Sequence, residues 1–320
     1  MTALAPTATA PRRSTPKGAS FDPIFKWLCF SAATMLLAAL AGVVVSLILG
    51  SAPAFEKFGL GFFVTARWNP VTEVYGAAGP IVGTLITAFL SLLIALPVSF
   101  GVAVFLTEFC PKMLRRPIGI AVELLAGVPS IVYGMWGLFV LAPAFAKYIQ
   151  LPIIMAVPAG SFLEKITAGV PNGANILTAS IILSIMILPY MAATMRDLFL
   201  TVPVKVRESA YGIGATPLEV VFSVTLPYVR RSVIGAVMLG LGRALGETMA
   251  VTFVIGNSHR FPESLFDSGS TIASTIANEF AEASTPMHTA SLIALGLVLF
   301  IITFVILALA RALIGQKQPV

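Results

Sequence analysis

Residues 196–231 read RDLFLTVPVKVRESAYGIGATPLEVVFSVTLPYVRR, a stretch that separates two long apolar runs. We expect residues 204–211 to form a short helix. Gly212 and Gly214 should then interrupt it, because glycine readily adopts the left-handed backbone that a tight reversal needs. Thr216–Pro217 predicts the start of a second helix, with threonine as the N-cap and proline at the first helical position. The stretch is therefore predicted to hold two short helices joined by a bend.

The overall composition is that of an integral membrane protein. Of the 320 residues, 58% are hydrophobic and 11% are charged, and the mean hydropathy is +0.95. Soluble domains carry about 25% charged residues. Basic loops beside a membrane explain the net charge of +6 better than binding to nucleic acid does. The two cysteines, Cys29 and Cys110, have neither disulfide nor metal-site spacing.

Six apolar runs are long enough to cross a bilayer, for which a helix needs about 20 residues. They occupy residues 27–55, 76–107, 124–146, 166–195, 232–257 and 289–310. The fourth run contains a Pro-Asn-Gly turn at 171–173, so its helix is expected to start near Ala174. The predicted fold class is all-α, a polytopic membrane protein with six transmembrane helices.

The chain is predicted to divide into three segments. Residues 1–20 are rich in Thr, Ala and Pro without apolar periodicity, which predicts a disordered cytoplasmic tail. Residues 21–75 hold the first transmembrane helix and an outer loop. That helix is much longer than the apolar part of a signal peptide, about 7–15 residues, so we interpret it as a retained anchor. Residues 76–315 hold the other helices, with loop 196–231 on one side and outer loop 257–288 on the other.

The distribution of basic residues predicts the orientation of the helices. The N-terminus, the loops 108–117 and 196–231 and the C-terminus together hold 14 Lys and Arg residues, whereas the opposite loops hold 5. Both termini and loop 196–231 are therefore expected to be cytoplasmic.

Loop 196–231 also carries a spaced motif. A Glu-Ser-Ala triplet is followed four residues later by a glycine, and twelve residues after that by a Leu-Pro pair where the second short helix is expected to end: Glu208, Ser209, Ala210, Gly214, Leu226 and Pro227. This spacing resembles the cytoplasmic signature of the permeases of ATP-binding-cassette (ABC) importers. The resemblance implies a type I importer permease fold, in which the motif residues couple the chain to an ATPase subunit. The alternative is an amphipathic helix that rests on lipid headgroups.

Two charges interrupt the fifth apolar run, which reads LGLGRALGETMA over residues 239–250. If the helix starts near residue 231, Arg243 lies roughly 18 Å deep, near the middle of a hydrocarbon core about 30 Å thick. Glu247, four residues on, would lie on the same face. Charges at this depth usually face a bundle interior or a water-filled cavity, and a guanidinium suits a tetrahedral oxyanion. Arg243 and Glu247 are therefore predicted to line a substrate pathway; the alternative is a structural ion pair.

No catalytic machinery is apparent in the sequence. It lacks the G-x-x-x-x-G-K-[S/T] loop that binds ATP phosphates, so the chain is expected to be no enzyme and to hold no cofactor. The importer resemblance implies that a partner ATPase binds ATP and magnesium. His259 and His288 have no metal-ligand partner at helical spacing and are interpreted as solvent-exposed loop residues.

A narrower resemblance rests on three segments. GLGRALGETMAV at 240–251, ELLAGVPSIVYG at 123–134 and Leu-Thr-Glu at 106–108 are typical of the permeases of phosphate importers. The resemblance implies a bacterial inner-membrane assembly of two different permeases, two ATPase subunits and an external phosphate-binding protein. Importers of sulfate, molybdate or phosphonate remain alternatives, as does a secondary anion transporter or channel.

Overall fold

The computed structural model describes residues 22–158 and 160–315, so the predicted tail at 1–20 lies outside the described residues. The described part contains no strand and six helical spans long and apolar enough to cross a membrane. These spans are Pro23–Phe58, Ala78–Phe109, Ser130–Ala156, Ile176–Leu200, Pro217–Leu245 and Pro286–Ala312. The predicted all-α fold with six spans is confirmed.

The chain divides into two units between Leu49 and Gly50. The first unit holds most of helix α1 (Asp22–Phe58), a long apolar helix. Two aromatic rings in it, Trp27 and Phe30, meet edge to face with centroids 5.8 Å apart. The second unit holds the end of α1 and every later helix of the described residues.

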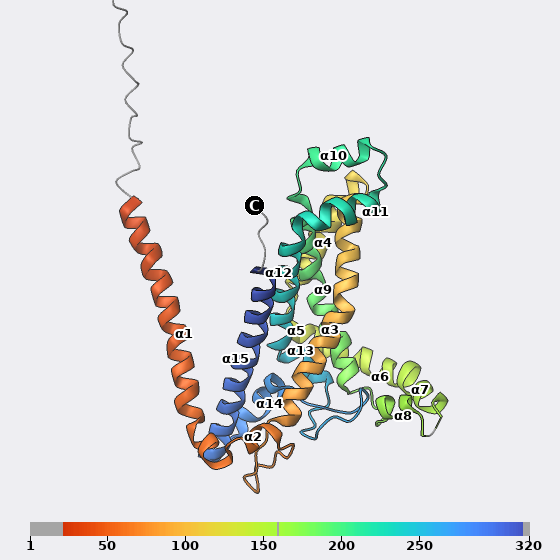
Figure 1. The fold of residues 1–320 in the computed structure, drawn as a ribbon. Helices are drawn as coiled ribbons and strands as arrows, with labels where there is room; N and C mark the ends of the chain where they lie inside the picture. Colours follow the sequence, from red (N-terminus) through yellow and green to blue (C-terminus); the bar gives the residue numbers. More distant parts are fainter. Residues whose placement is uncertain (1–21, 159, 316–320) are drawn as a thin grey trace, which may run out of the picture. The chain divides into compact units, whose positions relative to one another are not determined.

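Helix α9 (Ile176–Leu200) is the centre of the second unit. Helices α3 (Ala78–Val104), α4 (Lys112–Ala126) and α12 (Leu226–Leu245) pack against it (Figure 1). α9 begins where the sequence predicted, because the Asn175 side chain caps it by accepting a hydrogen bond from the Thr178 N–H at 2.8 Å. Small residues of α3, such as Ala95, face the buried aliphatic side chains of α9 in one core.

A second core joins the segment before α3 to the last helix. Phe62 of α2 (Gly61–Val64) and Tyr75 pack with Leu292 and Leu295 of α15 (Pro286–Gly315). Helix α14 (Ile272–Glu279) and the 3-10 turn η5 (Phe280–Glu282) complete this end, which we call the α14 end. The segment 257–288, predicted as an outer loop, thus contains helix.

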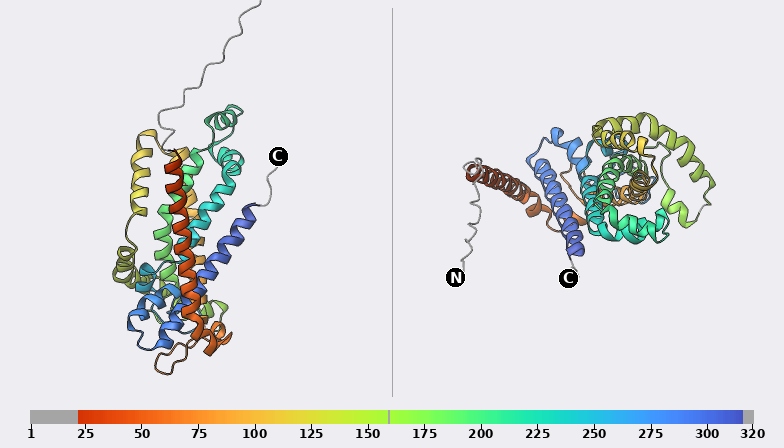
Figure 2. Two further views of the ribbon diagram at one scale, coloured as in Figure 1. Left: turned by 90° about the vertical axis from the view of Figure 1, so that its left-hand side faces the viewer. Right: turned by 90° about the horizontal axis from the view of Figure 1, so that it is seen from above.

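The third span differs from its predicted bounds of 124–146. Helix α4 already begins at Lys112, and the chain breaks at 127–129 before a new helix starts at Ser130. Pro129 explains the break, because proline has no N–H to donate and disfavours helical backbone in the residue before it. The new helix comprises α5 (Ser130–Trp136), π-helical η2 (Gly137–Leu141), α6 (Ala142–Phe145), π-helical η3 (Ala146–Gln150) and α7 (Leu151–Ala156). With α8 (Phe162–Thr167), its last part projects sideways from the bundle (Figures 1 and 2).

The fifth span differs in two ways. The second short helix does not end at Leu226–Pro227. Instead α11 (Pro217–Val220), π-helical η4 (Val221–Thr225) and α12 form one continuous helix. The π-helical turn accommodates Pro227, which has no N–H for a regular helical bond. The expected continuous run through 257 is also wrong, because α12 ends at Leu245 and α13 (Met249–Val254) begins after a break.

Candidate functional site

Helix α10 (Val204–Gly212) lies across one end of the bundle, whereas α3 and α9 run along it (Figure 1). We call this the α10 end. Gly214 follows the helix with a backbone φ of +93°, and the Ala215 N–H donates to the Ala210 carbonyl at 3.1 Å. This arrangement caps the helix through a left-handed glycine. The predicted short helix and glycine bend are confirmed.

The residues of the spaced motif form one compact element, because α10 packs against both α11 and η4. Glu208 and Ser209 are exposed on α10, and Ala210 is half-buried. Exposed apolar side chains surround them, including Ile213, which is 88% exposed. Leu226 and Pro227 lie at the start of α12, below this surface. The role of these residues in coupling stays a prediction.

A buried glutamate attaches α10 to the end of α3. Glu108 lies in the π-helical turn η1 (Phe105–Phe109) and its side chain is 3% exposed. Its carboxylate pairs with the Arg207 guanidinium and accepts a hydrogen bond of 2.8 Å from the Tyr211 hydroxyl. Burial and the bond to Glu108 raise the pKa of Tyr211. A buried carboxylate is costly unless it is paired in this way.

Glu108 stands out in the sequence within the Leu-Thr-Glu segment at 106–108, but its two partners do not. Arg207 and Tyr211 are four residues apart, so they lie on one face of α10. That spacing was the one feature of the sequence that could have pointed to a shared partner. It shows two polar groups facing the same way, but the acceptor lies 99 residues away from Arg207.

Arg243 and Glu247 do not share a continuous helix, so the expected common face is wrong. Arg243 lies in the last turn of α12, exposed in this chain, with its Cζ 5.9 Å from the centroid of the Tyr190 ring. Glu247 lies in the break and accepts a hydrogen bond of 3.3 Å from the Ala250 N–H. Within the described residues neither charge forms an ion pair, which contradicts the structural-pair alternative.

Two interrupted helices pack side by side next to these charges. Gly134 of α5 lies directly against α13, where a Cβ atom would come within 2.8 Å of Phe253 and 3.1 Å of the Ala250 Cα. At the break in the third span, the Tyr133 hydroxyl donates to the Leu125 carbonyl at 3.0 Å. The same carbonyl also accepts the Val128 N–H at 3.3 Å, so the side chain adds a second bond at this helix end. Interrupted helices within a membrane are tolerated where they are buried in protein or line a cavity.

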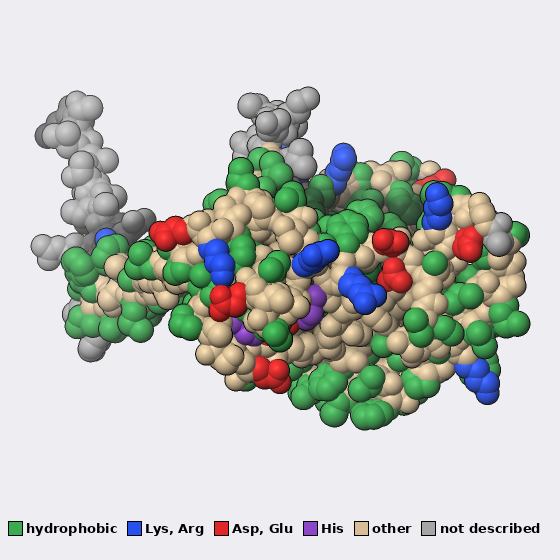
Figure 3. Space-filling model, turned by 90° about the horizontal axis from the view of Figure 1, so that it is seen from below, with side chains coloured by type: hydrophobic (Ala, Val, Ile, Leu, Met, Phe, Trp, Pro, Cys, Tyr) green, Lys and Arg blue, Asp and Glu red, His purple; other side chains and the backbone are tan. Residues whose placement is uncertain are grey.

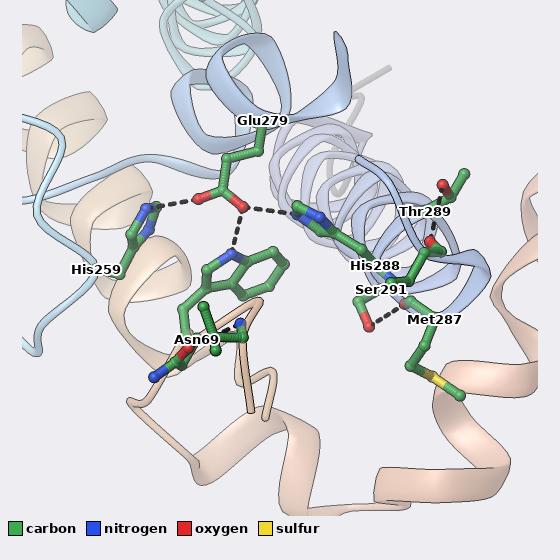
Figure 4. Close-up of polar contacts among 10 residues, drawn as sticks. Asn69, His259, Glu279, Met287, His288, Thr289 and Ser291 are labelled. Carbon is green, nitrogen blue, oxygen red and sulfur yellow. Dashed lines mark hydrogen bonds and ion pairs between the residues drawn. The ribbon is translucent and has the colours of Figure 1, made fainter. Parts of the chain in front are cut away.

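A second glutamate, Glu279, is half-buried and organises the α14 end (Figure 4). The carboxylate of Glu279 lies 2.7 Å from His259 Nε2 and 2.8 Å from His288 Nε2, and it accepts a hydrogen bond of 2.5 Å from Trp68 Nε1. Burial alone would raise the pKa of Glu279, but the hydrogen bonds from His259, Trp68 and His288 outweigh it, so the pKa is lowered.

The two histidines therefore have a structural role that the sequence did not indicate. His288 is only 4% exposed, so its interpretation as a solvent-exposed residue is wrong, and His259 is half-buried. In a view of the α14 end, little of the histidine surface is visible among the other side chains (Figure 3). Among the described residues, no group of three or more His, Cys, Asp or Glu side chains is arranged so that it could hold a metal ion.

The fold is that of an ABC-importer permease. The chain belongs to the family of binding-protein-dependent transport system inner membrane components, which matches residues 99–316. The fold is also similar to a chain of a bacterial ABC transporter that imports the acidic polysaccharide alginate. That similarity has a TM-score of 0.58 at 18% identity and covers 95% of this chain and 100% of the other. The protein is therefore a multi-pass inner-membrane protein.

Within that family the chain belongs with the PstC proteins. It is 54% identical to the phosphate transport system permease protein PstC of Mesorhizobium japonicum, over 91% of this chain and 89% of that protein. The corresponding protein of Pasteurella multocida is 53% identical over 87% of both chains. PstC 2 of Mycobacterium tuberculosis is 37% identical over 92% of both chains.

Proposed function

We propose that this chain is a permease subunit of an ATP-driven inorganic phosphate importer and forms half of its translocation pathway. The observation that carries the proposal is the 54% identity to a phosphate transport system permease over nearly the whole chain. At that level of similarity the substrate and the mode of energy supply are expected to be shared.

Arg243 is the residue proposed to meet phosphate. Its guanidinium is exposed and has no described carboxylate partner, so its donors are available to phosphate oxygens. Arginine presents these donors in a planar fork that fits such oxygens two at a time. Glu247 lies in the adjacent break, where it holds the start of α13 and adds a negative charge near the pathway. Breaks of this kind near the bilayer midplane form substrate sites in other transporters.

The α10 surface is proposed to dock on a separate ATPase subunit, which binds ATP and magnesium. Glu208, Ser209, Ala210 and Gly214 form this surface, with Leu226 and Pro227 at the helix that follows it. The ion pair between Glu108 and Arg207 gives a direct mechanical link from α10 to α3. A movement of the ATPase would thus reach the bundle without a flexible connection between them.

The full assembly is proposed to contain a second, PstA-like permease, PstB-like ATP-binding subunits and a PstS-like external phosphate-binding protein. The α10 end and both termini are proposed to face the cytoplasm, which the distribution of basic residues supports. A cysteine in place of the exposed Ile213 should react with an impermeant reagent only after the membrane is opened. Labelling in intact spheroplasts would contradict this assignment and place the α10 end on the outer side of the membrane.

Uptake of radiolabelled phosphate by Arg243→Ala and Glu247→Ala cells tests the pathway assignment, with sulfate uptake as the control. Arg243→Ala should lower phosphate uptake at least about tenfold, since a charge-assisted contact is worth about 1.5–3 kcal/mol. Glu247→Ala should have a smaller effect. Normal phosphate uptake in both variants would remove these residues from the pathway. A loss of sulfate uptake instead would favour an importer of another tetrahedral oxyanion, and uptake without ATP would favour a secondary transporter.

A further inference from the structure

A cavity of about 460 Å³ lies at the α10 end, between η1, α4 and the last turns of α9. This volume is within the range of small-molecule binding pockets, roughly 300–1,000 Å³. Eight residues line it, namely Leu106, Lys112, Arg115, Arg116, Ile120, Glu123, Arg196 and Leu200. Half of them are cations, and one is an anion.

The charges in this cavity do not balance within the chain. Arg196 is neutralised, because its Nη2 lies 2.5 Å from Glu123 and 2.6 Å from Asp197. The three cations on α4 (Lys112, Arg115 and Arg116) form no ion pair with any described carboxylate. Since two carboxylates meet this one arginine, the four cations around the cavity exceed the carboxylates by two, and no α4 cation has a carboxylate of its own.

The placement of these cations is unfavourable without an external anion. Lys112 lies three and four residues before Arg115 and Arg116, so the three charges share one side of α4. Like charges at these spacings destabilise a helix by about 0.2–0.5 kcal/mol per pair. The Nε of Arg115 is also buried with no hydrogen-bond partner, while its Nη2 reaches only the Cys110 carbonyl at 3.5 Å. The guanidinium of Arg115 is thus only weakly satisfied by the protein itself.

We propose that this cavity binds a phosphate group, carried either by the headgroup of an anionic phospholipid or by inorganic phosphate. Two arginines and a lysine match the donors that recognise phosphate oxygens. The apolar walls formed by Leu106, Ile120 and Leu200 lie beside them, as the start of an acyl chain would require. Basic pockets between transmembrane helices bind such headgroups in other membrane proteins. The site is separate from Arg243, and its existence does not depend on phosphate import.

The chain contains a matched control for the test. Arg115→Gln/Arg116→Gln removes two charges from the cavity, and Arg230→Gln/Arg231→Gln removes two exposed charges from α12, outside it. The full-length purified chain is first examined by native mass spectrometry with phosphatidylglycerol and with phosphatidylcholine. It is then titrated with inorganic phosphate, with sulfate as the comparison. Thermal unfolding of each variant reports whether it is folded, and Arg116→Gln alone provides a milder variant at an exposed position.

Wild type and the α12 control should bind at least one of the two phosphate probes with the same affinity, and the α4 variant should bind it about tenfold more weakly or worse. Arg116→Gln should fall between them. Binding of phosphatidylglycerol alone assigns the site to lipid, and binding of inorganic phosphate alone assigns it to the free ion. The proposal is overturned if wild type binds neither probe, or if the α4 and α12 variants lose binding equally.

Discussion

A glutamate organises each end of the helical bundle, with a buried side chain at the α10 end and a half-buried one at the α14 end, and the two glutamates have different partners. At the α10 end, Glu108 pairs with an arginine and a tyrosine and connects two elements, η1 and α10. At the α14 end, Glu279 contacts two histidines and a tryptophan from three separate parts of the chain. The Glu108 contact joins the bundle to an exposed helix. The Glu279 contacts form a hydrogen-bond cluster that holds three segments together within one end of the bundle. We infer that the first transmits force and the second maintains structure.

Loss of the Glu108 carboxylate should give the largest effect. Glu108→Ala leaves the half-buried Arg207 without its counter-charge. Breaking a fully buried pair costs about 3–5 kcal/mol, and the cost here should lie near or below the lower end of that range. Because the loss falls between α10 and α3, ATP hydrolysis by the assembled transporter should continue while phosphate uptake falls by more than tenfold. The ratio of transport to ATP hydrolysis measures this uncoupling.

A double variant with the two charges exchanged tests whether the ion pair itself is needed for coupling. Glu108→Arg/Arg207→Glu restores an ion pair with its direction exchanged and should recover part of the transport ratio. Equal losses of transport and ATP hydrolysis in Glu108→Ala, with no recovery in the double variant, would assign Glu108 a purely structural role.

Loss of the Glu279 charge should act on stability rather than on coupling. Glu279→Gln replaces one acceptor oxygen by an NH2 donor, so at least one of the three donors loses its acceptor, at a cost of about 1–3 kcal/mol. The melting temperature of the purified chain should fall, with the transport ratio unchanged. Glu282→Gln is the matched control, because Glu282 is exposed and lies three residues further on. An unchanged melting temperature in Glu279→Gln would show that the hydrogen-bond cluster around Glu279 contributes nothing to stability.

The glycine bend beside the Glu108 contact should give a smaller effect. Gly214→Leu places a side chain at a φ of +93°, where nothing lies within 4 Å of its Cβ, so the cost is backbone strain of about 1–2 kcal/mol rather than a clash. Gly214→Asn tolerates this backbone better and should retain more transport. Copurification of the ATPase measures docking, and equal transport in Gly214→Leu and wild type would exclude the bend from coupling.

The smallest expected effect is a difference between wild type and Glu279→Gln in how their stability depends on pH. The pKa of Glu279 is lowered in the folded chain, so the unfolded chain binds this proton more readily. The stability that Glu279 contributes is therefore present above the ordinary glutamate pKa and is lost as the pH falls through its lowered value. Melting curves of wild type should lose stability in acid more steeply than those of Glu279→Gln. Parallel curves would contradict this linkage.

The sequence predicts the transmembrane spans well and their interruptions poorly. Apolar length alone identifies a span, because a helix must cover the bilayer. The breaks at 127–129 and 246–248 depend on whether a neighbouring helix is close enough to stabilise open backbone. Gly134 allows that approach, yet glycine and proline also occur in unbroken membrane helices. Pro129 and Gly246 are therefore visible in the sequence, but the helix breaks that they mark are not.

The candidate site was predictable to a similar degree. The motif residues around Glu208 and the two charges at 243 and 247 were visible, because unusual residue types stand out in an apolar chain. Their geometry was not, since Arg243 faces Tyr190 on another helix and Glu108 finds Arg207 only in the folded chain. Contacts of this kind are set by tertiary packing and leave no local pattern.

The most direct test of ATP-driven phosphate import is reconstitution of the complete assembly in liposomes, with ATP supplied on the side that α10 faces. We expect phosphate to accumulate on that side only with ATP and the binding protein. Sulfate should not compete, and Arg243→Ala should remove the accumulation. Phosphate movement without ATP, or accumulation that persists in Arg243→Ala, would contradict it.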